Sequence, residues 1–395
     1  MYFVSDRSGW WNLYRWDGHR VEAVAPIAGE CAAEPWELGY ASYGFLDDGR
    51  IVVAVQEGPR HRLVVIDPNS TIRPVDLPYT SIKPYLAVRG TTVALIGSSP
   101  TAAPQVALID LDGADPQVTV LARSEHSALD GARVSTPTQL RVRVASDREV
   151  LALVYPPTGA AADWRAPVIV RAHPGPTASC LLRLDWQAQF FTSRGFAVVD
   201  VDYLGSTGYG RVFRESLYGR WGLNDVEDCA AVAVHLLSTG RAVPGQVFIR
   251  GASAGGYTAL HAVAQDGPFA AATAVSAIVD PGRWAKTVPR FQRAHAVRLQ
   301  GGAGRVRAAA VQRPVLLIHG TADEVAVVED VRELADELTS LGMAPEVLFL
   351  SDVGHYVATS GRAGTALEAE LAHYRSVMAE AANGHAGHTA ASGSR

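Results

Sequence analysis

The chain has 395 residues, of which 48% are hydrophobic and 19% charged, and its formal net charge is −5. A single core stops growing at roughly 250–300 residues, so this length predicts two folding units in an ordinary globular protein. The acidic balance, with no run of Lys or Arg, argues against a nucleic-acid partner.

The start of the chain and its cysteines bear on the compartment. The N-terminal residues have neither the basic nor the apolar segment of a secretion signal, and no apolar stretch reaches the roughly 18 residues of a membrane helix. We therefore expect a cytoplasmic protein with no membrane partner. Cys31, Cys180 and Cys229 are widely spaced without a CxxC pair, so we expect no disulfide and no metal site, and nothing indicates a cofactor.

Residues 1–127 consist of short β-rich runs separated by turn signals such as Asp-Gly and Pro-Asn-Ser. This pattern predicts an all-β meander, typical of propeller blades and also of a sandwich. At about 40 residues for a four-stranded blade, the region has room for about three blades of a partial β-propeller. Residues 128–167 then form a connecting segment that contains the first strands of the next domain.

Residues 168–381 alternate apolar strands with longer amphipathic or Ala-rich segments, which predicts an α/β domain with a largely parallel sheet. The expected strands are 168–172, 196–202, 247–250, 272–277, 315–319 and 346–350, and the clearest helices are 226–238, 256–264 and 328–341. The Gly/Ala/Ser-rich residues 382–395 are expected to be a disordered tail.

A G-x-S-x-G motif stands between an expected strand and an expected helix, with Ser253 at its centre. This is the setting of a nucleophile elbow, in which glycines permit a sharp turn and the serine hydroxyl is held clear of the sheet. Serine needs a histidine to take its proton and an acid to orient that histidine, in the chain order Ser, acid, His. The sequence therefore predicts a serine hydrolase.

The acid and the base are expected on loops that follow two later strands. Asp323 follows the strand 315–319, and His355 follows the strand 346–350. Because ligands bind at the carboxyl ends of strands in such sheets, we assign Asp323 as the orienting acid and His355 as the general base. The weaker alternatives are the acids Asp280, Asp330 and Asp352 and the histidines His319, His373, His385 and His388.

The oxyanion hole and the substrate pocket are less sharply defined. The backbone N–H of Ala254 is one expected donor, because it follows the nucleophile. His173, in a rigid turn after the first strand, is the candidate second donor, although a histidine that only packs beside the site would give the same sequence. Ile278, Val279 and Trp284 are candidates for an apolar pocket, and for each of them packing in the core is an equally good interpretation.

Further motifs make a family resemblance specific. Residues 202–211 read DYLGSTGYGR, Trp221-Gly222 and Asp225 follow, and GASAGGYTAL, HGTAD and GHY come after them in that order. With these motifs the chain resembles, over nearly its whole length, the prolyl oligopeptidase family of serine peptidases, particularly its acylaminoacyl-peptidase and dipeptidyl-peptidase-like bacterial branch. The resemblance implies an α/β-hydrolase catalytic domain with an N-terminal β-propeller.

The resemblance also implies hydrolysis of peptide or amide bonds of short peptides through an acyl-enzyme on Ser253. An esterase or amidase acting on a small natural product, or a non-catalytic remnant, remains open. Two features depart from the family: about three blades instead of about seven, as in an N-terminally shortened chain, and local changes at Leu204 and residues 173–176. An incomplete propeller leaves a blade edge free to pair with a second copy, so a homo-oligomer also remains open.

Overall fold

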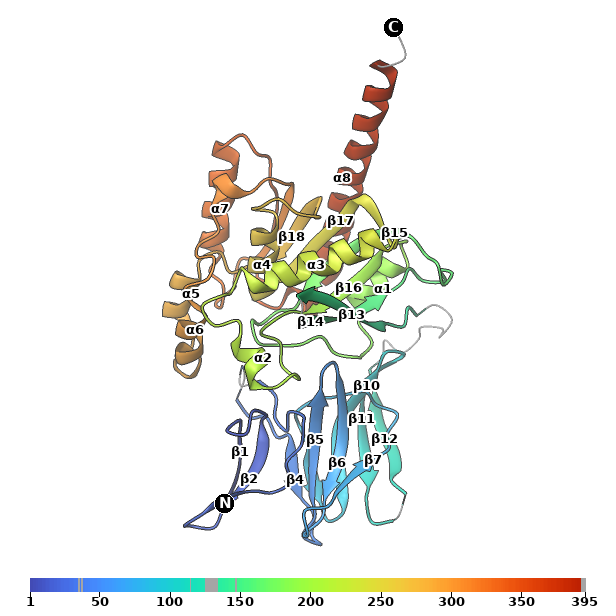
Figure 1. The fold of residues 1–395 in the computed structure, drawn as a ribbon, viewed down its shortest axis with the longest axis vertical. Coiled ribbons are helices and arrows are strands. Elements are labelled where there is room, and N and C mark those ends of the chain that lie inside the picture. Colours follow the sequence, from blue (N-terminus) through green and yellow to red (C-terminus); the bar gives the residue numbers. More distant parts are fainter. Residues whose placement is uncertain (35, 37, 114, 125–133, 146–147, 392–395) are drawn as a thin grey trace. The chain divides into compact units, whose positions relative to one another are not determined.

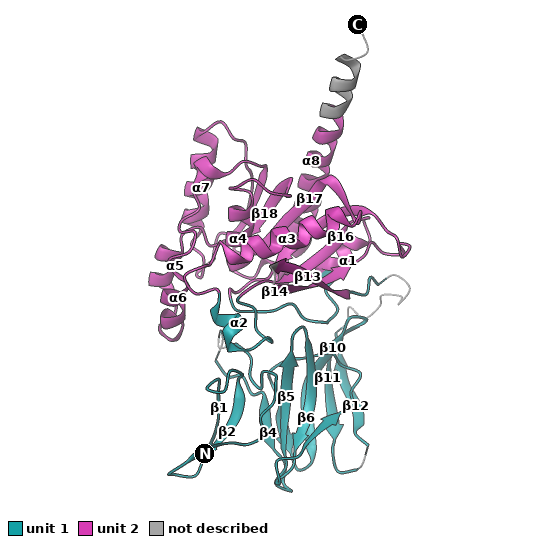
Figure 2. Ribbon diagram, in the orientation of Figure 1, with its two compact units in different colours: residues 1–137, 177–186, 205–216 teal, residues 138–176, 187–204, 217–395 magenta. Residues whose placement is uncertain are grey.

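The computed structural model describes residues 1–34, 36, 38–113, 115–124, 134–145 and 148–391. The chain divides into two compact units, drawn in different colours in Figure 2. Unit 1 comprises Met1–Pro137, Thr177–Trp186 and Gly205–Ser216. Unit 2 comprises Thr138–Pro176, Gln187–Leu204 and Leu217–Arg395.

Unit 1 consists of successive antiparallel sheets (Figure 1). The strands of the first are β1 (Tyr2–Ser5), β2 (Asn12–Trp16) and β3 (Val21–Ala23), and those of the second are β4 (Tyr43–Phe45), β5 (Ile51–Glu57), β6 (Arg60–Ile66) and β7 (Ile72–Val75). The strands of the third are β8 (Ser81–Ile82), β9 (Ala87–Arg89), β10 (Thr92–Ser99), β11 (Ala102–Asp110) and β12 (Gln117–Arg123). In the first two sheets each strand pairs with its neighbour in sequence, as in the predicted meander, and in the third sheet β8 and β9 both pair with β10.

The second sheet is buried on both faces, and this explains why its strands are continuously apolar. Val52 and Ala54 of β5 belong to a core shared with β10 and β11, whereas Val53 and Val55 belong to a core shared with β2. Alternate residues of a strand point to opposite faces, so each face of this sheet packs against a neighbouring sheet. Stacking of this kind is how propeller blades bury their faces.

Unit 1 also includes two segments that the sequence analysis assigned to the 168–381 domain. Within Thr177–Trp186, Leu182 N–H donates to the carbonyl of Pro59 at 2.8 Å. Within Gly205–Ser216, the carbonyl of Gly208 accepts from Gly58 N–H at 2.8 Å. These bonds tie the two segments to the β-rich unit, so the division is not the linear one at 127 that the change in sequence texture suggested.

Unit 2 is built on one mixed sheet with the strand order β13-β14-β16-β15-β17-β18-β19-β20. Its strands are β13 (Thr138–Ala145), β14 (Arg148–Tyr155), β15 (Ala166–Ala172), β16 (Ala197–Asp202), β17 (Ala242–Ala252), β18 (Ala271–Val275), β19 (Val315–Gly320) and β20 (Glu346–Leu350). The pairs β13–β14 and β14–β16 are antiparallel, and from β16 through β20 all neighbours are parallel. The carboxyl ends of β15, β17, β18, β19 and β20 therefore meet at one edge of the sheet.

Helices connect these strands and cover the sheet (Figure 1). They are α1 (Trp186–Thr192), α3 (Asn224–Ser238), α4 (Ala254–Ala262), α5 (Pro281–Thr287), α6 (Arg293–Leu299), α7 (Val328–Ser340) and α8 (Ala363–Ala391), with short 3₁₀ turns η2 (Arg290–Gln292), η3 (Ala308–Ala310) and η4 (Val357–Thr359). The short helix α2 (Arg211–Glu215) belongs to unit 1. In β19, Leu317 packs in the core that includes Leu334 of α7, and Ile318 packs in the core that includes Ala366 of α8. Both faces of the sheet are thus covered.

The C-terminal segment differs from the predicted tail over 382–395. Helix α8 continues to Ala391, and residues 392–395 lie outside the described part. Alanine has the highest intrinsic helix propensity, and this Ala-rich segment extends a helix that packing has already formed upstream. Among the described residues, no helix has the length and apolar character needed to span a membrane.

Candidate active site

The predicted elbow joins β17 to α4. Ser253 has φ 53° and ψ −116°, a conformation that non-glycine residues rarely adopt. A Cβ on Gly251 would collide with the carbonyl of Gly255, and a Cβ on Gly255 would collide with the carbonyl of Ala172. The two glycines of the motif are therefore required by backbone packing around the serine.

Hydrogen bonds to neighbouring loops hold the Ser253 backbone in place. Its N–H donates to Val275 at the end of β18 at 2.9 Å, and its carbonyl accepts from Ile278 N–H at 3.3 Å. Ala254, which follows it, is fully buried and is the first residue of α4. An N–H in the first turn of a helix has no intrahelical acceptor, so it is free to bind an anion.

Asp323 and His355 are brought together by the loops after β19 and β20. The Asp323 carboxylate accepts from His355 Nδ1 at 2.8 and 3.0 Å, and from the N–H groups of Val325 and Ala326 at 2.9 Å each. Burial acts to raise the pKa of Asp323, but these hydrogen bonds and the nearby His355 outweigh it, so its pKa lies below the ordinary value. An ionised Asp323 fixes the proton of His355 on Nδ1 and leaves Nε2 to accept a proton.

Ser253 and His355 lie on the same edge of the mixed sheet, and both are half-buried. In the part of the chain that the structure describes, no hydrogen bond joins Ser253 Oγ to His355. Catalytic hydrogen bonds are often loose in a protein without substrate and tighten when the substrate binds.

The alternative acids and histidines have other positions. Asp280 caps α5 by accepting from Gly282 N–H at 2.8 Å, and Asp352 is exposed at φ 59°. His373 bonds to Glu346 at 2.8 Å. His319 is fully buried behind Asp323, where Nε2 donates to the carbonyl of Ala326 at 2.8 Å and burial lowers its pKa.

His173 lies in the loop after β15, buried against Tyr203. The rings stack at 4.0 Å between centroids, and Nδ1 is 3.0 Å from the Gly175 carbonyl and 3.1 Å from the Tyr203 hydroxyl. Burial lowers the pKa of His173 to about 3, so the ring is neutral at ordinary pH. Tyr203 belongs to the DYLGSTGYGR motif, and its contact with His173 could not be predicted from that motif.

The motif residue Asp225 supports the helix that carries the elbow. Its carboxylate accepts from Gly222 N–H at 2.7 Å and from the Thr258 hydroxyl at 2.5 Å, which links α3 to α4. Complete burial raises the pKa of Asp225 to about 6. Both hydrogen bonds favour the charged form and offset part of the cost of burying it.

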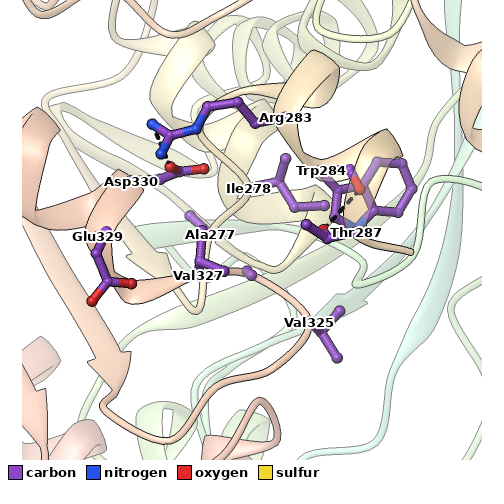
Figure 3. Close-up of a pocket in the computed structure, with 10 residues that line it drawn as sticks. Ala277, Ile278, Arg283, Trp284, Thr287, Val325, Val327, Glu329 and Asp330 are labelled. Carbon is purple, nitrogen blue, oxygen red and sulfur yellow. Dashed lines mark hydrogen bonds and ion pairs between the residues drawn. The ribbon is translucent and has the colours of Figure 1, made fainter. Parts of the chain in front are cut away.

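A cavity of about 290 Å³ opens beside the acid loop (Figure 3). It is lined by Ala277, Ile278, Arg283, Trp284, Thr287, Val325, Ala326, Val327, Glu329 and Asp330. Ile278 and Trp284 lie where a pocket was predicted. Val279 does not: it is 1% exposed in the core and its carbonyl accepts from Val306 N–H at 2.9 Å.

The rest of the pocket lining was not predicted from the sequence: Ala277 follows β18, and the other residues come from α5, the loop after β19 and the start of α7. The one available signal was that residues 325–327 directly follow the predicted acid. Among the described residues, no three His, Cys, Asp or Glu side chains lie together as a metal site would require.

Comparisons with known proteins agree with this architecture. A family model described as the prolyl oligopeptidase family matches residues 182–381. The structure of a puromycin-hydrolyzing peptidase of Mycobacterium tuberculosis is 35% identical in sequence, covers 95% of this chain and 60% of its own, and has a TM-score of 0.89. The structure of a puromycin hydrolase is 32% identical, covers 96% of this chain and 60% of its own, and also has a TM-score of 0.89. Acylamino-acid-releasing enzyme of Arabidopsis thaliana is 32% identical over 25% of this chain and 13% of its own length.

The chain thus spans about 60% of the length of these solved structures and a smaller share of the curated relative. The predicted fold, an α/β-hydrolase catalytic domain preceded by a β-rich domain, is confirmed.

Proposed function

The chain belongs to the prolyl oligopeptidase family, and from this premise we propose that it is a serine peptidase that hydrolyses peptide or amide bonds of short peptides through an acyl-enzyme on Ser253. The observation that carries the proposal is the pairing of His355 with the ionised Asp323, at the sheet edge where the elbow places Ser253. The structures with TM-scores of 0.89 add support at the level of the fold and of related peptidases.

In the proposed acylation, His355 Nε2 takes the proton of Ser253 as Oγ attacks the carbonyl carbon of the scissile bond. The tetrahedral intermediate carries its negative charge on the former carbonyl oxygen. His355 then gives its proton to the leaving nitrogen, the carbon–nitrogen bond breaks, and the amine departs. The acyl group remains as an ester of Ser253.

Deacylation repeats these steps with water. His355 takes a proton from water, the resulting hydroxide attacks the ester carbon, and the proton returns to Oγ as the carboxylic acid leaves. Asp323 stays ionised throughout, holding the Nδ1 proton and stabilising the cationic imidazole.

The oxyanion requires fixed donors, and Ala254 N–H is the first we propose. His173 remains the candidate second donor, and its tautomer decides whether the ring can act. If Nδ1–H donates to the Gly175 carbonyl, Nε2 is only an acceptor. If the Tyr203 hydroxyl donates to Nδ1, the proton is on Nε2 and can be donated to the oxyanion.

We assign the cavity to the substrate side chain next to the scissile bond. Its wall residue Ile278 is hydrogen-bonded to the Ser253 carbonyl, and its wall residues Val325 and Ala326 are hydrogen-bonded to the Asp323 carboxylate. Ser253 and Asp323 are therefore each hydrogen-bonded to residues of the cavity wall. A side chain seated there would lie beside the reacting carbonyl.

The test is an assay with acylaminoacyl and aminoacyl p-nitroanilides, with p-nitrophenyl esters to separate a peptidase from an esterase, and with puromycin because two similar structures are of puromycin-hydrolyzing proteins. A fluorophosphonate probe should label Ser253, and the Ser253→Ala variant should neither be labelled nor turn over substrate. Absence of labelling in the parent protein would support a non-catalytic remnant.

We further propose that the enzyme acts in the cytoplasm. Cys31 and Cys229 are free, buried thiols, which suit a reducing compartment. Fractionation of the source cells tests this location.

A further inference from the structure

The cavity beside Asp323 has an apolar part and a polar part. Figure 3 shows Arg283, Glu329 and Asp330 on one side, away from Val325 and Thr287. Its volume of about 290 Å³ is roughly ten times the ~30 Å³ share of one liquid water, which suits a single large side chain.

Asp330 is the unusual residue of this lining. It lies in the first turn of α7, its side chain is only 9% exposed, and Arg283 Nη1 forms an ion pair with its Oδ1 at 2.8 Å. Among the described residues, Asp330 Oδ1 is buried and has no hydrogen-bond partner, so the ion pair leaves its acceptor capacity unfilled. A buried acceptor without a donor is unfavourable unless a ligand supplies one.

The same lining contains a large aromatic surface with an unfilled donor. Trp284 is 7% exposed, and within the described part of the chain its Nε1 is buried without a hydrogen-bond partner. Trp284 also packs edge-to-face on Trp221 at 5.7 Å between centroids, which fixes the wall. An aromatic ligand ring would find a rigid apolar face here.

Arg283 influences which kind of hydrogen-bond donor a ligand can present to Asp330. Its Nη1 also lies 2.8 Å from Glu333, so the guanidinium stands between two carboxylates. A cationic ligand group that approached Asp330 would meet this guanidinium, whose repulsion offsets part of the attraction from Asp330, Glu329 and Glu333. A neutral hydroxyl can donate to the Asp330 carboxylate, which lines the cavity, without that repulsion.

We propose that this pocket selects an aromatic side chain with a terminal hydroxyl, as in tyrosine, and that Asp330 is the specificity-determining residue that accepts its hydrogen bond. The inference rests on the proposed function, since it assigns the side chain to the residue that Ser253 acylates. A hydrogen bond to a charged acceptor corresponds to a preference for tyrosine over phenylalanine of about 10- to 100-fold.

The test compares kcat/KM for two N-acetylated p-nitroanilides, of tyrosine and of phenylalanine, which differ by one hydroxyl. In Asp330→Ala the ratio should fall to about 1, and in Asp330→Asn, which keeps a neutral acceptor oxygen, it should take an intermediate value. Asp336→Asn is the matched control, because Asp336 is an exposed residue of the same helix that does not line the cavity, and its ratio should equal that of the parent. A ratio of two substrates does not depend on the folded fraction of a variant.

Binding to Ser253→Ala protein separates this inference from the proposed function. N-acetyltyrosine amide should bind about 10- to 100-fold more tightly than N-acetylphenylalanine amide, and the added Asp330→Ala change should remove the difference, whether or not the parent protein hydrolyses anything. Equal affinities, or a preference that survives Asp330→Ala, would overturn the inference. So would a lysine derivative that is preferred over a norleucine derivative through Asp330. Loss of turnover and of fluorophosphonate labelling would count only against the proposed function.

Discussion

The loops after β15 and β20 each carry a histidine to the same edge of the mixed sheet and surround it differently. His355, after β20, is half-buried with Nδ1 against the carboxylate of Asp323. His173, after β15, is buried with Nδ1 against the carbonyl of Gly175 and its ring stacked on Tyr203. Strand position alone therefore does not make a histidine a base.

The environment of each ring accounts for the difference in proposed role. A carboxylate stabilises the imidazolium that forms when a histidine takes up a proton, and it fixes the tautomer as well. Burial opposes protonation of His173 more strongly than its hydrogen bond with the Gly175 carbonyl favours it, so the pKa of His173 falls to about 3. The first setting suits proton transfer, and the second suits a neutral ring that orders a loop or donates one hydrogen bond.

The largest expected effect contrasts the two histidines directly. His355→Ala should lower kcat/KM by about a millionfold, because the variant loses the group that takes the serine proton. His173→Ala should lower it by about a hundredfold, the usual cost of one oxyanion donor. Steady-state assays of the purified variants on one p-nitroanilide decide this, and equal losses in both would contradict the distinction between them.

The next effect tests the carboxylate that distinguishes the loops. Asp323→Asn should leave the fold intact and lower kcat by about four orders of magnitude, because the amide stabilises the wrong tautomer of His355. Asp352→Asn is the matched control: this exposed residue lies three positions before His355 and should retain nearly full activity. If Asp352→Asn were the more damaging change, the orienting acid would have been misassigned.

The triad candidates could be predicted because each depends on local sequence. Ser253, Asp323 and His355 all directly follow apolar strands, and parallel strands bring such positions to one edge. Beyond the end of a strand, the direction in which a side chain points depends on tertiary packing and not on the local sequence. Ile278 lines the cavity whereas Val279, one residue later, packs in the core against the loop of Val306.

The polar end of the pocket could not be predicted from the sequence, for a related reason. Asp330 could be recognised as a helical residue and set aside as a catalytic acid, but its pairing with Arg283 joins two segments that are distant in sequence. The assignment of residues 177–186 and 205–216 to unit 1 has the same origin, because both segments are held by backbone hydrogen bonds to β-rich loops far away in the chain.

A smaller effect concerns the residue that sets the tautomer of His173. Tyr203→Phe removes the hydroxyl 3.1 Å from Nδ1 and should lower kcat about tenfold with KM unchanged, because the Nδ1–H tautomer then becomes favoured and only a minor fraction of the protein keeps the proton on Nε2 for the oxyanion. Tyr374→Phe removes another buried hydroxyl of unit 2, one that donates to Glu370, and should leave kcat unaltered. An unchanged kcat in Tyr203→Phe would leave His173 as a packing residue only.

The smallest expected effect is a pH dependence of the free energy of unfolding, and it follows from the neutrality of His173. Since burial lowers the native pKa of His173 to about 3 and an unfolded histidine titrates near ~6.5, between pH 4 and 5.5 the unfolded state binds about one proton more at this residue than the native state does. Its contribution to the free energy of unfolding therefore rises with pH across that window, by about 1.4 kcal/mol per pH unit, and is lost as the pH falls.

His173→Asn removes the titrating ring while keeping a polar side chain beside the Gly175 carbonyl. Denaturant unfolding of parent and variant at several pH values between 4 and 5.5 should give curves that converge toward low pH, with a slope difference of about 1.4 kcal/mol per pH unit. The other histidines of the chain are present in both proteins and cancel in the difference. Parallel curves would mean that His173 takes up a proton in the native state as readily as in the unfolded chain, and the two histidine loops would then not differ in the way their surroundings require.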